Sequence, residues 1–295
     1  MTSTASASVI DNAIRLRDGR RLSYVECGAP DGVPVVLLHG TPGSRLIGPV
    51  FHREALSCNV RLICPDRPGY GNSTFRRSSM VEWVGDLGEL ADALTIDRFA
   101  VIGVSGGGPF ALASATTIPE RLSSVAVVSG VGPLDESDSL SLIGGSDHSL
   151  IKLARRAPWA LAPVISVAVF AVKPFMDRMM ASMMKSMPEA DRASLEDPTL
   201  SAALKAHTLE AFRHGVRGLA WDELLFSRPW GFQLEDIKIP ILLWQGEEDA
   251  TVLPEMGRRQ AAAIPNCTAT FCAGAGHYLI AAHMTEILSA LTAKQ

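Results

Sequence analysis

Residues 99–107 read FAVIGVSGG, and this stretch says more about the fold than any other part of the sequence. Its first six residues are apolar throughout, which is typical of a β-strand covered on both faces. The pattern from Gly103 to Gly107 then fits a nucleophile elbow, where a serine occupies a strained turn between a strand and a helix. Glycines on either side let strand and helix approach without Cβ clashes. We therefore predict that Ser105 is a nucleophile.

Apolar runs of the same kind recur along the chain and predict the strands of one sheet. Two β-patterned runs at Ala13–Arg17 and Arg21–Cys27 flank Asp18-Gly19, a dipeptide typical of a hairpin turn. The buried-strand runs are Val33–Leu38, Val60–Cys64, Phe99–Val104, Ser124–Val128, Ile239–Trp244 and Thr268–Cys272. Together these runs predict eight strands.

Helical patterns separate the strands. Ser79 and Glu82 have the spacing of a capping box at the start of an amphipathic helix. Further helices are predicted at Ala111–Ala115, Pro254–Ala263 and Leu279–Leu291. Strands that alternate with helices form parallel sheets with right-handed crossovers. The sequence thus predicts an α/β fold with a mostly parallel eight-stranded sheet flanked by helices.

The alternation stops after the sixth strand-like run. Residues 133–235 show helical patterns, internal prolines and no convincing strand. We expect this segment to form a helical cap over the carboxyl edge of the sheet, where open α/β sheets bind ligands. The predicted division is a core of residues 1–132 and 236–295 and a cap of residues 133–235.

A histidine and an acid with the right placement follow the last two strands. His277 alone among seven histidines lies in a strand-to-helix loop near the carboxyl end, after Gly274-Ala275-Gly276. Three consecutive acids, Glu247 to Asp249, follow the strand before it. We favour Asp249 because it lies at the far end of that loop, with Glu248 as the alternative. The order Ser105, Asp249, His277 is that of the nucleophile-elbow fold.

The loop HGTPG at residues 39–43 supplies the remaining part of the predicted site. In this fold, one oxyanion donor is the N–H after the nucleophile and another comes from a loop after an early strand. Pro42 has no N–H to donate. We assign the two donors as the backbone N–H groups of Thr41 and Gly106. His39 is expected to order the loop rather than to take part in catalysis.

These motifs together resemble the α/β-hydrolase superfamily, in the branch of proline iminopeptidases, haloalkane dehalogenases and small esterases. The resemblance covers Val33–Gly132 and Ile239–Leu291, including the family-type loop DRPGYGNS at residues 66–73. Dehalogenases and epoxide hydrolases of this type carry an aspartate where Ser105 stands. The run Gly106-Gly107-Gly108 lacks the tryptophan usual in prolyl aminopeptidases, which argues against peptidase activity.

The resemblance implies a serine hydrolase acting on a carboxylic ester of a small or medium apolar substrate, with no metal or organic cofactor. A lactonase, a thioesterase or a C–C bond hydrolase would use the same triad. A hydroxynitrile lyase would need a cap lysine, for which Lys152, Lys173, Lys185 and Lys205 are candidates. A hypothesis of another class is a ligand sensor that turns over very slowly.

The predicted cap carries two further patterns. Methionines recur at helical spacing from Met176 to Met187; such a stripe is usually core, but it could line a pocket, with Met180 and Met184 as candidates. Six basic residues and one aspartate lie between Lys152 and Lys185. This segment could meet anionic lipid or an acidic substrate, although a solvated helix face is the commoner reason for such charges.

Composition restricts the remaining possibilities. The net charge of −4 provides no basic field to attract nucleic acid. Five cysteines without metal-ligand spacing fit a reducing cytoplasm. The amino-terminal residues do not resemble a signal peptide, and the apolar stretch Trp159–Val172 is too short to span a bilayer. The oligomeric state is left open.

Overall fold

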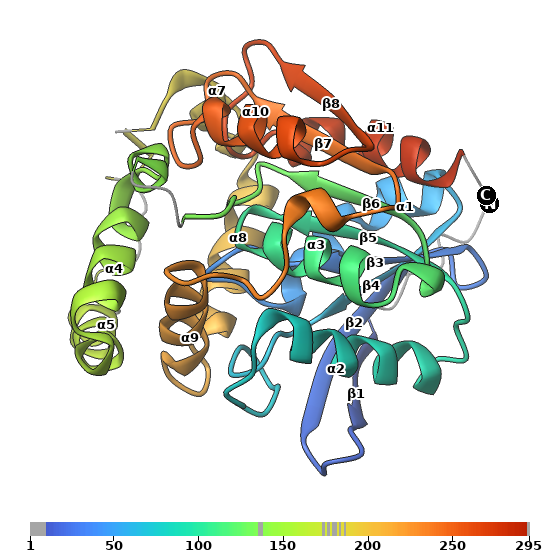
Figure 1. Cartoon of the computed structure of the whole chain (residues 1–295), viewed down its shortest axis with the longest axis horizontal. Coiled ribbons are helices and arrows are strands. Elements are labelled where there is room, and N and C mark those ends of the chain that lie inside the picture. Colours follow the sequence, from blue (N-terminus) through green and yellow to red (C-terminus); the bar gives the residue numbers. More distant parts are fainter. Residues whose placement is uncertain are drawn as a thin grey trace.

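A computed structural model describes residues 10–134, 138–172, 175, 178, 182, 184, 185 and 187–293. Its centre is one eight-stranded sheet with the order β1-β2-β4-β3-β5-β6-β7-β8. β2 is antiparallel to both of its neighbours, β1 and β4, and the other pairs are parallel. Figure 1 shows the twisted sheet with helices on both faces. The mostly parallel sheet predicted from the sequence is confirmed.

The eight strands correspond to the eight predicted runs. They are β1 (Ile10–Arg15), β2 (Arg21–Gly28), β3 (Val33–Leu38), β4 (Val60–Pro65), β5 (Phe99–Val104), β6 (Leu122–Val128), β7 (Ile241–Gly246) and β8 (Cys267–Cys272).

β3 and β5 have the predicted bounds, β2, β4, β6 and β8 extend one or two residues beyond them, and β1 and β7 are shifted along the chain. β1 spans Ile10–Arg15 instead of Ala13–Arg17, because Leu16 closes the hairpin loop with a hydrogen bond from its N–H to Arg20 O at 2.8 Å. β7 begins at Ile241 rather than Ile239, since the intervening Pro240 has no N–H for the sheet.

Helices cover both faces of the sheet. Those outside the segment between β6 and β7 are α1 (His52–Ser57), α2 (Met80–Ala93), α3 (Gly108–Thr117), α10 (Pro254–Ala263) and α11 (Ile280–Thr292). Buried residues of α2, α3 and α10 pack on one face, and those of α1 and α11 on the other. Val36 and Leu38 of β3 face the first cluster, whereas Val35 and Leu37 face the second, so both faces of this strand are covered as predicted.

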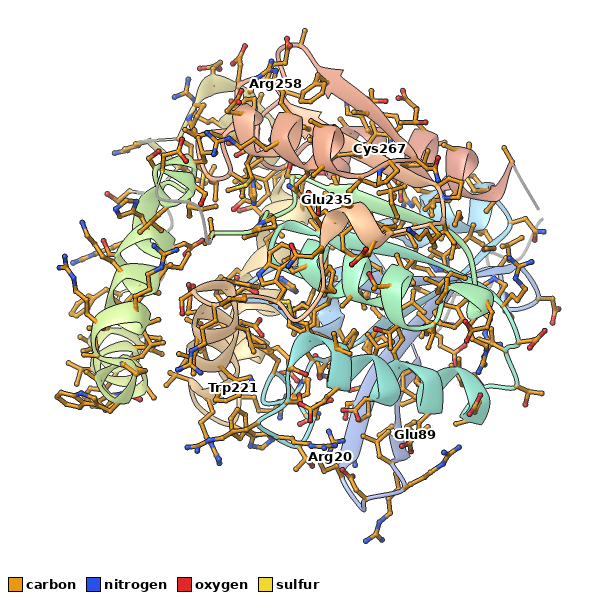
Figure 2. The ribbon with its side chains drawn as sticks, in the orientation of Figure 1. Arg20, Glu89, Trp221, Glu235, Arg258 and Cys267 are labelled. Carbon is orange, nitrogen blue, oxygen red and sulfur yellow. The ribbon has the colours of Figure 1, made fainter. Side chains whose placement is uncertain are left out.

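Local sequence signals explain how two of these elements begin. The predicted capping box of α2 is present, with Ser79 and Glu82 each accepting a hydrogen bond from the other's backbone N–H. Gly19 occupies the hairpin turn at φ +87°, a conformation that glycine adopts without strain. Arg20, which is labelled in Figure 2, then fastens the hairpin to α2 through two hydrogen bonds of 2.6 Å to Asp86.

The segment between β6 and β7, residues 129–240, is referred to below as the insertion. Its described α-helices are α4 (Gly145–Arg156), α5 (Pro158–Val172), α7 (Glu189–Leu195), α8 (Pro198–Ala211) and α9 (Arg217–Phe226). Leu161, Ile165 and Leu219 contribute to a small apolar cluster of its own. In Figure 1, α9 lies between the α4–α5 pair and the sheet. That residues 133–235 act as a separate cap domain stays a prediction.

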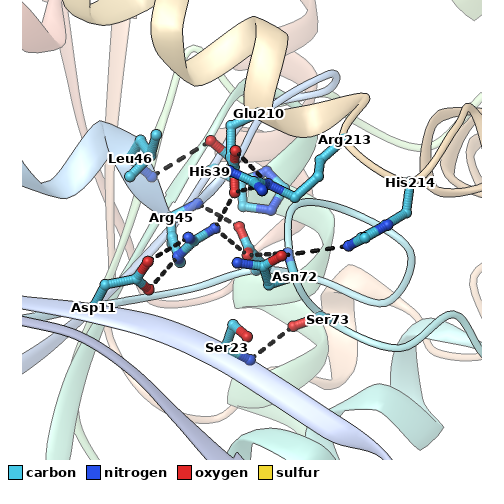
Figure 3. A network of polar contacts seen from close by, with 12 residues as sticks. Asp11, Ser23, His39, Arg45, Leu46, Asn72, Ser73, Glu210, Arg213 and His214 are labelled. Atoms are coloured by element: carbon cyan, nitrogen blue, oxygen red, sulfur yellow. Dashed lines mark hydrogen bonds and ion pairs between the residues drawn. The ribbon is translucent and has the colours of Figure 1, made fainter.

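A buried arginine fastens the insertion to the sheet. Arg45, only 2% exposed, makes ion pairs with Asp11 of β1, Asp66 after β4 and Glu210 of α8, at 2.7, 2.9 and 2.6 Å (Figure 3). A buried guanidinium is tolerated only when its donors are paired, so the three segments must assemble together. The same contacts hold the loop after β4 in place beside the site.

Candidate active site

Ser105 lies on a strained turn at the carboxyl end of β5. Its φ is +52°, which a residue other than glycine adopts at a cost of about 1–3 kcal/mol. The flanking glycines are required by close packing: a Cβ on Gly103 would lie 2.5 Å from the Gly107 carbonyl oxygen. A Cβ on Gly107 would lie 2.3 Å from that of Leu38. The turn thus has the geometry that the sequence motif predicts.

Two loops from the carboxyl ends of β7 and β8 bring a histidine and an acid to Ser105. His277 Nε2 lies 3.0 Å from Ser105 Oγ. His277 Nδ1 lies 2.8 Å from Asp249 Oδ2. Glu248, the alternative acid, is exposed. The structure therefore brings together the three residues predicted from the sequence, in one hydrogen-bonded chain.

The Asp249 carboxylate is buried and held on both oxygens. Oδ1 accepts hydrogen bonds from the N–H groups of Thr251 and Val252, at 2.8 and 2.9 Å. Oδ2 accepts a further one from Gln245 Nε2 at 3.0 Å. Burial raises the pKa of Asp249, but His277 and the backbone N–H groups lower it by more, so this pKa lies below its ordinary value. Asp249 is an ionised partner for His277.

The environment of His277 favours the imidazolium. Burial lowers the pKa of His277, but the charge and hydrogen bond of Asp249 raise it by more, with smaller contributions from Asp191 and Asp147, so the pKa lies above its ordinary value of 6.5. A histidine of this kind takes up a proton readily yet can return it near neutral pH.

The proposed general base gives a testable pH profile. Only neutral His277 can accept the proton of Ser105, so kcat/KM for a 4-nitrophenyl ester is expected to fall as the pH decreases through the pKa of His277. Asp191→Asn removes one charge that raises this pKa. We expect the acidic limb of the profile to move to lower pH in this variant and to stay in place in Glu286→Gln. If the acidic limb of the pH profile did not move in Asp191→Asn, the contribution of Asp191 to the pKa of His277 would be contradicted.

The turn after β3 lies directly against the elbow. A Cβ on Gly40 would lie 3.4 Å from Ser105 Cβ, and one on Gly106 would lie 2.3 Å from Thr41 Oγ1. Thr41 and Gly106, the predicted donors, are therefore neighbours beside Ser105. Buried His39 accepts a hydrogen bond from Arg67 N at Nε2 and contacts Gly40 O at 2.8 Å through Nδ1. Its position fits the loop-ordering role expected for it.

A carboxylate of the insertion also fastens the Thr41 turn, and no pattern in the sequence indicated this role. Asp222 Oδ2, on α9, accepts hydrogen bonds from Thr41 Oγ1, Arg67 Nη2 and Tyr70 Oη, at 2.8, 2.7 and 2.8 Å. Arg67 also donates to His39 O and to Thr41 Oγ1. A helix distant in sequence thus holds the turn that carries a predicted oxyanion donor.

Other acids of the insertion lie near His277, and sequence reasoning missed them as well. Asp191 of α7 accepts a hydrogen bond from Tyr278 N at 3.0 Å. Asp147 of α4 is an electrostatic neighbour of both His277 and Glu223. Glu223 is 1% exposed, and no donor among the described residues reaches its Oε2. Burial, and then Asp147 and Asp222, raise the pKa of Glu223 well above its ordinary value.

The apolar side of the site includes Phe226, the last residue of α9. Its ring would come within 3.1 Å of a Cβ on Gly106. Of the predicted pocket residues, Met184 is half-buried and Met180 lies outside the described residues. Their role as pocket lining stays a prediction. Four lysines were named as candidates for a hydroxynitrile lyase. Of these, Lys152 and Lys185 are exposed, Lys205 is half-buried, and Lys173 lies outside the described residues.

Neither a metal-ligand cluster nor a membrane-spanning helix is found in the described part of the chain. No group of three or more histidines, cysteines, aspartates and glutamates there is arranged to hold a metal ion. No described helix has the length and apolar character needed to cross a membrane.

The family follows from the chain's similarity to known proteins. The model of the alpha/beta hydrolase family matches residues 35–290. The chain therefore belongs to the alpha/beta hydrolase family, and the membership predicted from its sequence motifs is confirmed.

Two solved structures share the fold over nearly the whole chain. An esterase from Thermogutta terrifontis has a TM-score of 0.68 at 22% identity, covering 97% of both chains. The enol-lactonase from Burkholderia xenovorans has a TM-score of 0.68 at 20% identity, covering 96% of this chain and 100% of that chain. At such identities the likeness is one of fold alone.

Curated relatives match over a shorter stretch. The proline iminopeptidase of Xylella fastidiosa is 39% identical over 110 residues, which are 35% of this chain and 34% of the relative. The chain matches other relatives named proline iminopeptidase over a similar share of their length.

Proposed function

We propose that the protein is a serine hydrolase in which Ser105 is the nucleophile, His277 the general base and Asp249 the acid that orients the histidine. The observation that carries this proposal is the hydrogen-bonded chain from Ser105 through His277 to Asp249, with contacts of 3.0 and 2.8 Å. A nucleophile within reach of a base that is itself oriented by a third group is the arrangement that acyl transfer requires.

In the proposed cycle, Ser105 Oγ attacks the carbonyl carbon and His277 Nε2 takes its proton. Asp249 stabilises the imidazolium, which then gives the proton to the leaving group. A water activated by His277 attacks the acyl-enzyme, and the acid product leaves with Ser105 restored. Because each step passes one proton through His277 Nε2, no group beyond the triad is needed for proton transfer.

We assign the oxyanion hole to the backbone N–H groups of Thr41 and Gly106. The close approach of Gly106 to Thr41 supports this assignment, because both donors must converge on one oxygen beside Ser105. A donor of this kind contributes about 3–4 kcal/mol to the transition state where it has been measured. The hydrogen bonds of Asp222 to the Thr41 side chain and to Arg67 would hold the turn in place for this task.

For the substrate, we propose a carboxylic ester with a small or medium apolar group. The position of Phe226 supports this choice, since its ring would come within 3.1 Å of a Cβ on Gly106 and therefore lies beside the proposed oxyanion hole. Lactones, thioesters and activated C–C bonds need the same triad, so the substrate test includes them. We also propose a cytoplasmic location, which the five free thiols support.

The direct test is labelling with a fluorophosphonate probe together with hydrolysis of 4-nitrophenyl esters of increasing chain length, a lactone, a thioester and a β-diketone. Labelling and ester turnover are expected, with a preference for one range of chain lengths. Protein that is folded, binds ligands and neither labels nor turns over would overturn the proposal in favour of a ligand sensor.

One observation favours a second candidate, release of an amino-terminal residue from a peptide. Glu223 is a buried carboxyl with one oxygen that no donor among the described residues reaches. It lies one helical turn from Phe226, whose ring is close to Gly106. Asp147 adds a second carboxyl nearby. A substrate ammonium group would supply the charge and the donors that these acids lack. Relatives named proline iminopeptidase support the same candidate.

The Glu223→Gln variant distinguishes the two candidates. If Glu223 receives an ammonium group, the variant is expected to raise KM for an aminoacyl 4-nitroanilide by at least tenfold, because a charged hydrogen bond is worth about 1.5–3 kcal/mol. Turnover of an uncharged nitrophenyl ester should stay close to that of wild type. Glu235→Gln, on the surface away from α9, serves as the control (Figure 2). Aminoacyl turnover that is absent, or unaffected by Glu223→Gln, would remove the second candidate.

A further inference from the structure

The α5 helix is apolar on all sides, yet among the residues that the structure describes only one narrow side of it is covered. Its sequence PWALAPVISVAVFAV contains no charged residue. Leu161 and Ile165 are buried in the cluster formed within the insertion. The opposite side is exposed, and its large side chains are Trp159 (81% exposed), Val164 (47%), Val167 (70%) and Phe170 (83%). These four residues are called the α5 patch below.

Such a patch is unusual for a free surface. Helices that are apolar all round are normally buried in a protein core or in lipid. Large exposed apolar patches mark interaction sites with proteins or membranes. In Figure 1, α4 and α5 form the outer edge of the molecule, on the far side of α9 from the sheet. The α9 helix therefore separates α5 from the sheet whose loops carry the proposed active-site residues.

Charge complementarity indicates what covers the patch. Lys152, Arg155 and Arg156 lie in the last turns of α4, immediately before Trp159, and all three are exposed. Arg178 and Lys185 beyond α5 are exposed as well. Six basic residues and one acidic residue lie between residues 152 and 185, although the whole chain has a net charge of −4. The segment that contains the exposed apolar helix is thus net positive in a chain that is net negative.

From these observations we propose that α5 docks the protein on the surface of an anionic lipid membrane. Trp159 and Phe170 would enter the boundary between headgroups and acyl chains, and the α4 cations would contact lipid headgroups. Pairing of two copies through this face would bring two sets of like charges together, so a lipid surface fits the charges better. At 15 residues, α5 is too short to cross a bilayer and would lie along its surface. The proposal is independent of the bond that the enzyme cleaves.

The test is flotation with vesicles of phosphatidylcholine alone and of phosphatidylcholine with 30% phosphatidylglycerol, a composition chosen to be about as anionic as a cytoplasmic leaflet. Wild type is expected to float with the anionic vesicles and to be released by high salt. Trp159 fluorescence should shift to the blue on binding, because Trp159 is 81% exposed whereas Trp83, Trp230 and Trp244 are buried and Trp221 is half-buried.

Matched variants separate the contribution of the apolar side chains to membrane binding from that of the basic side chains. Trp159→Ser with Phe170→Ser is expected to lower the partition coefficient at least tenfold, since two large apolar side chains no longer leave water. Lys152→Gln with Arg156→Gln should lower it about 25-fold on anionic vesicles only, about fivefold for each charge. Leu56→Ser, an exposed apolar residue of α1 outside the patch, should change neither. All variants should keep the turnover of a soluble ester, which shows that they are folded.

Two results would overturn the proposal. One is wild type that floats with neither vesicle at low salt. The other is a concentration-dependent dimer in gel filtration that Trp159→Ser with Phe170→Ser dissociates, which would assign the patch to a second copy of the chain.

Discussion

Replacing Ser105 with alanine is expected to abolish hydrolysis, with a loss of about 10⁶-fold in kcat. The variant has no oxygen to attack the carbonyl carbon, although the proposed oxyanion hole and the substrate contacts are intact. Fluorophosphonate labelling should disappear together with turnover. The fold should be retained, because a φ of +52° costs alanine and serine a similar free energy at this position. Thermal unfolding measured beside turnover checks both expectations.

Ser129 provides a matched control. It is also a buried serine with a positive φ, +47°, at the carboxyl end of the neighbouring strand β6. No hydrogen-bond partner reaches its hydroxyl among the described residues. Ser129→Ala should therefore keep both labelling and turnover. Serine triads that lose the nucleophile keep only about a millionth of their turnover. If Ser105→Ala retained more than about a thousandth of wild-type turnover, Ser105 would not be the nucleophile.

The second large effect is expected for Asp249→Asn, with a loss of about 10⁴-fold in kcat. Oδ1 of Asp249 accepts two backbone N–H groups, so the amide oxygen of asparagine must take that place. The amide NH₂ group then faces His277 Nδ1 and forces the ring to accept there. His277 Nε2 consequently carries a proton toward Ser105 and cannot act as base.

The same substitution should also lower the free energy of unfolding by about 1–3 kcal/mol, because Gln245 Nε2 keeps Val252 O as an acceptor but loses Asp249 Oδ2 and faces the asparagine NH₂ group instead. The control is Glu248→Gln, which changes the adjacent exposed acid and should leave kcat and stability unchanged. A large loss in Glu248→Gln with little effect of Asp249→Asn would reverse the assignment of the acid.

The residues of the site that follow strands could be predicted from the sequence. Ser105, Asp249 and His277 each lie directly after an apolar run, and carboxyl ends of parallel strands meet at one edge of a sheet. Their convergence could be predicted because strand order and polarity do most of the positioning. Thr41 and Gly106 could be assigned for the same reason.

The contributions of the insertion could not be predicted. Asp222 and Glu223 are adjacent acids on α9. Asp222 accepts three hydrogen bonds at and beside the Thr41 turn, whereas Glu223 has a buried oxygen without a partner among the described residues. In sequence both resemble solvated charges of an ordinary helix. Their roles depend on which side of α9 packs against the core, and helical periodicity alone does not state which partner a face will meet.

The exposed side of α5 shows the same difference between what local sequence predicts and what packing decides. An apolar helix without charges is evident from its residues, and the natural expectation for such a helix is burial. Only the packing of Leu161 and Ile165 on the insertion, with Trp159 and Phe170 left outside, reveals that its other side has no cover among the described residues. The sequence by itself determined the sheet, the elbow and the order of the reactive residues, because these depend on local patterns. Tertiary structure decided which acids are buried, which are paired and which apolar face is exposed, since burial is a property of contacts between segments distant in the chain.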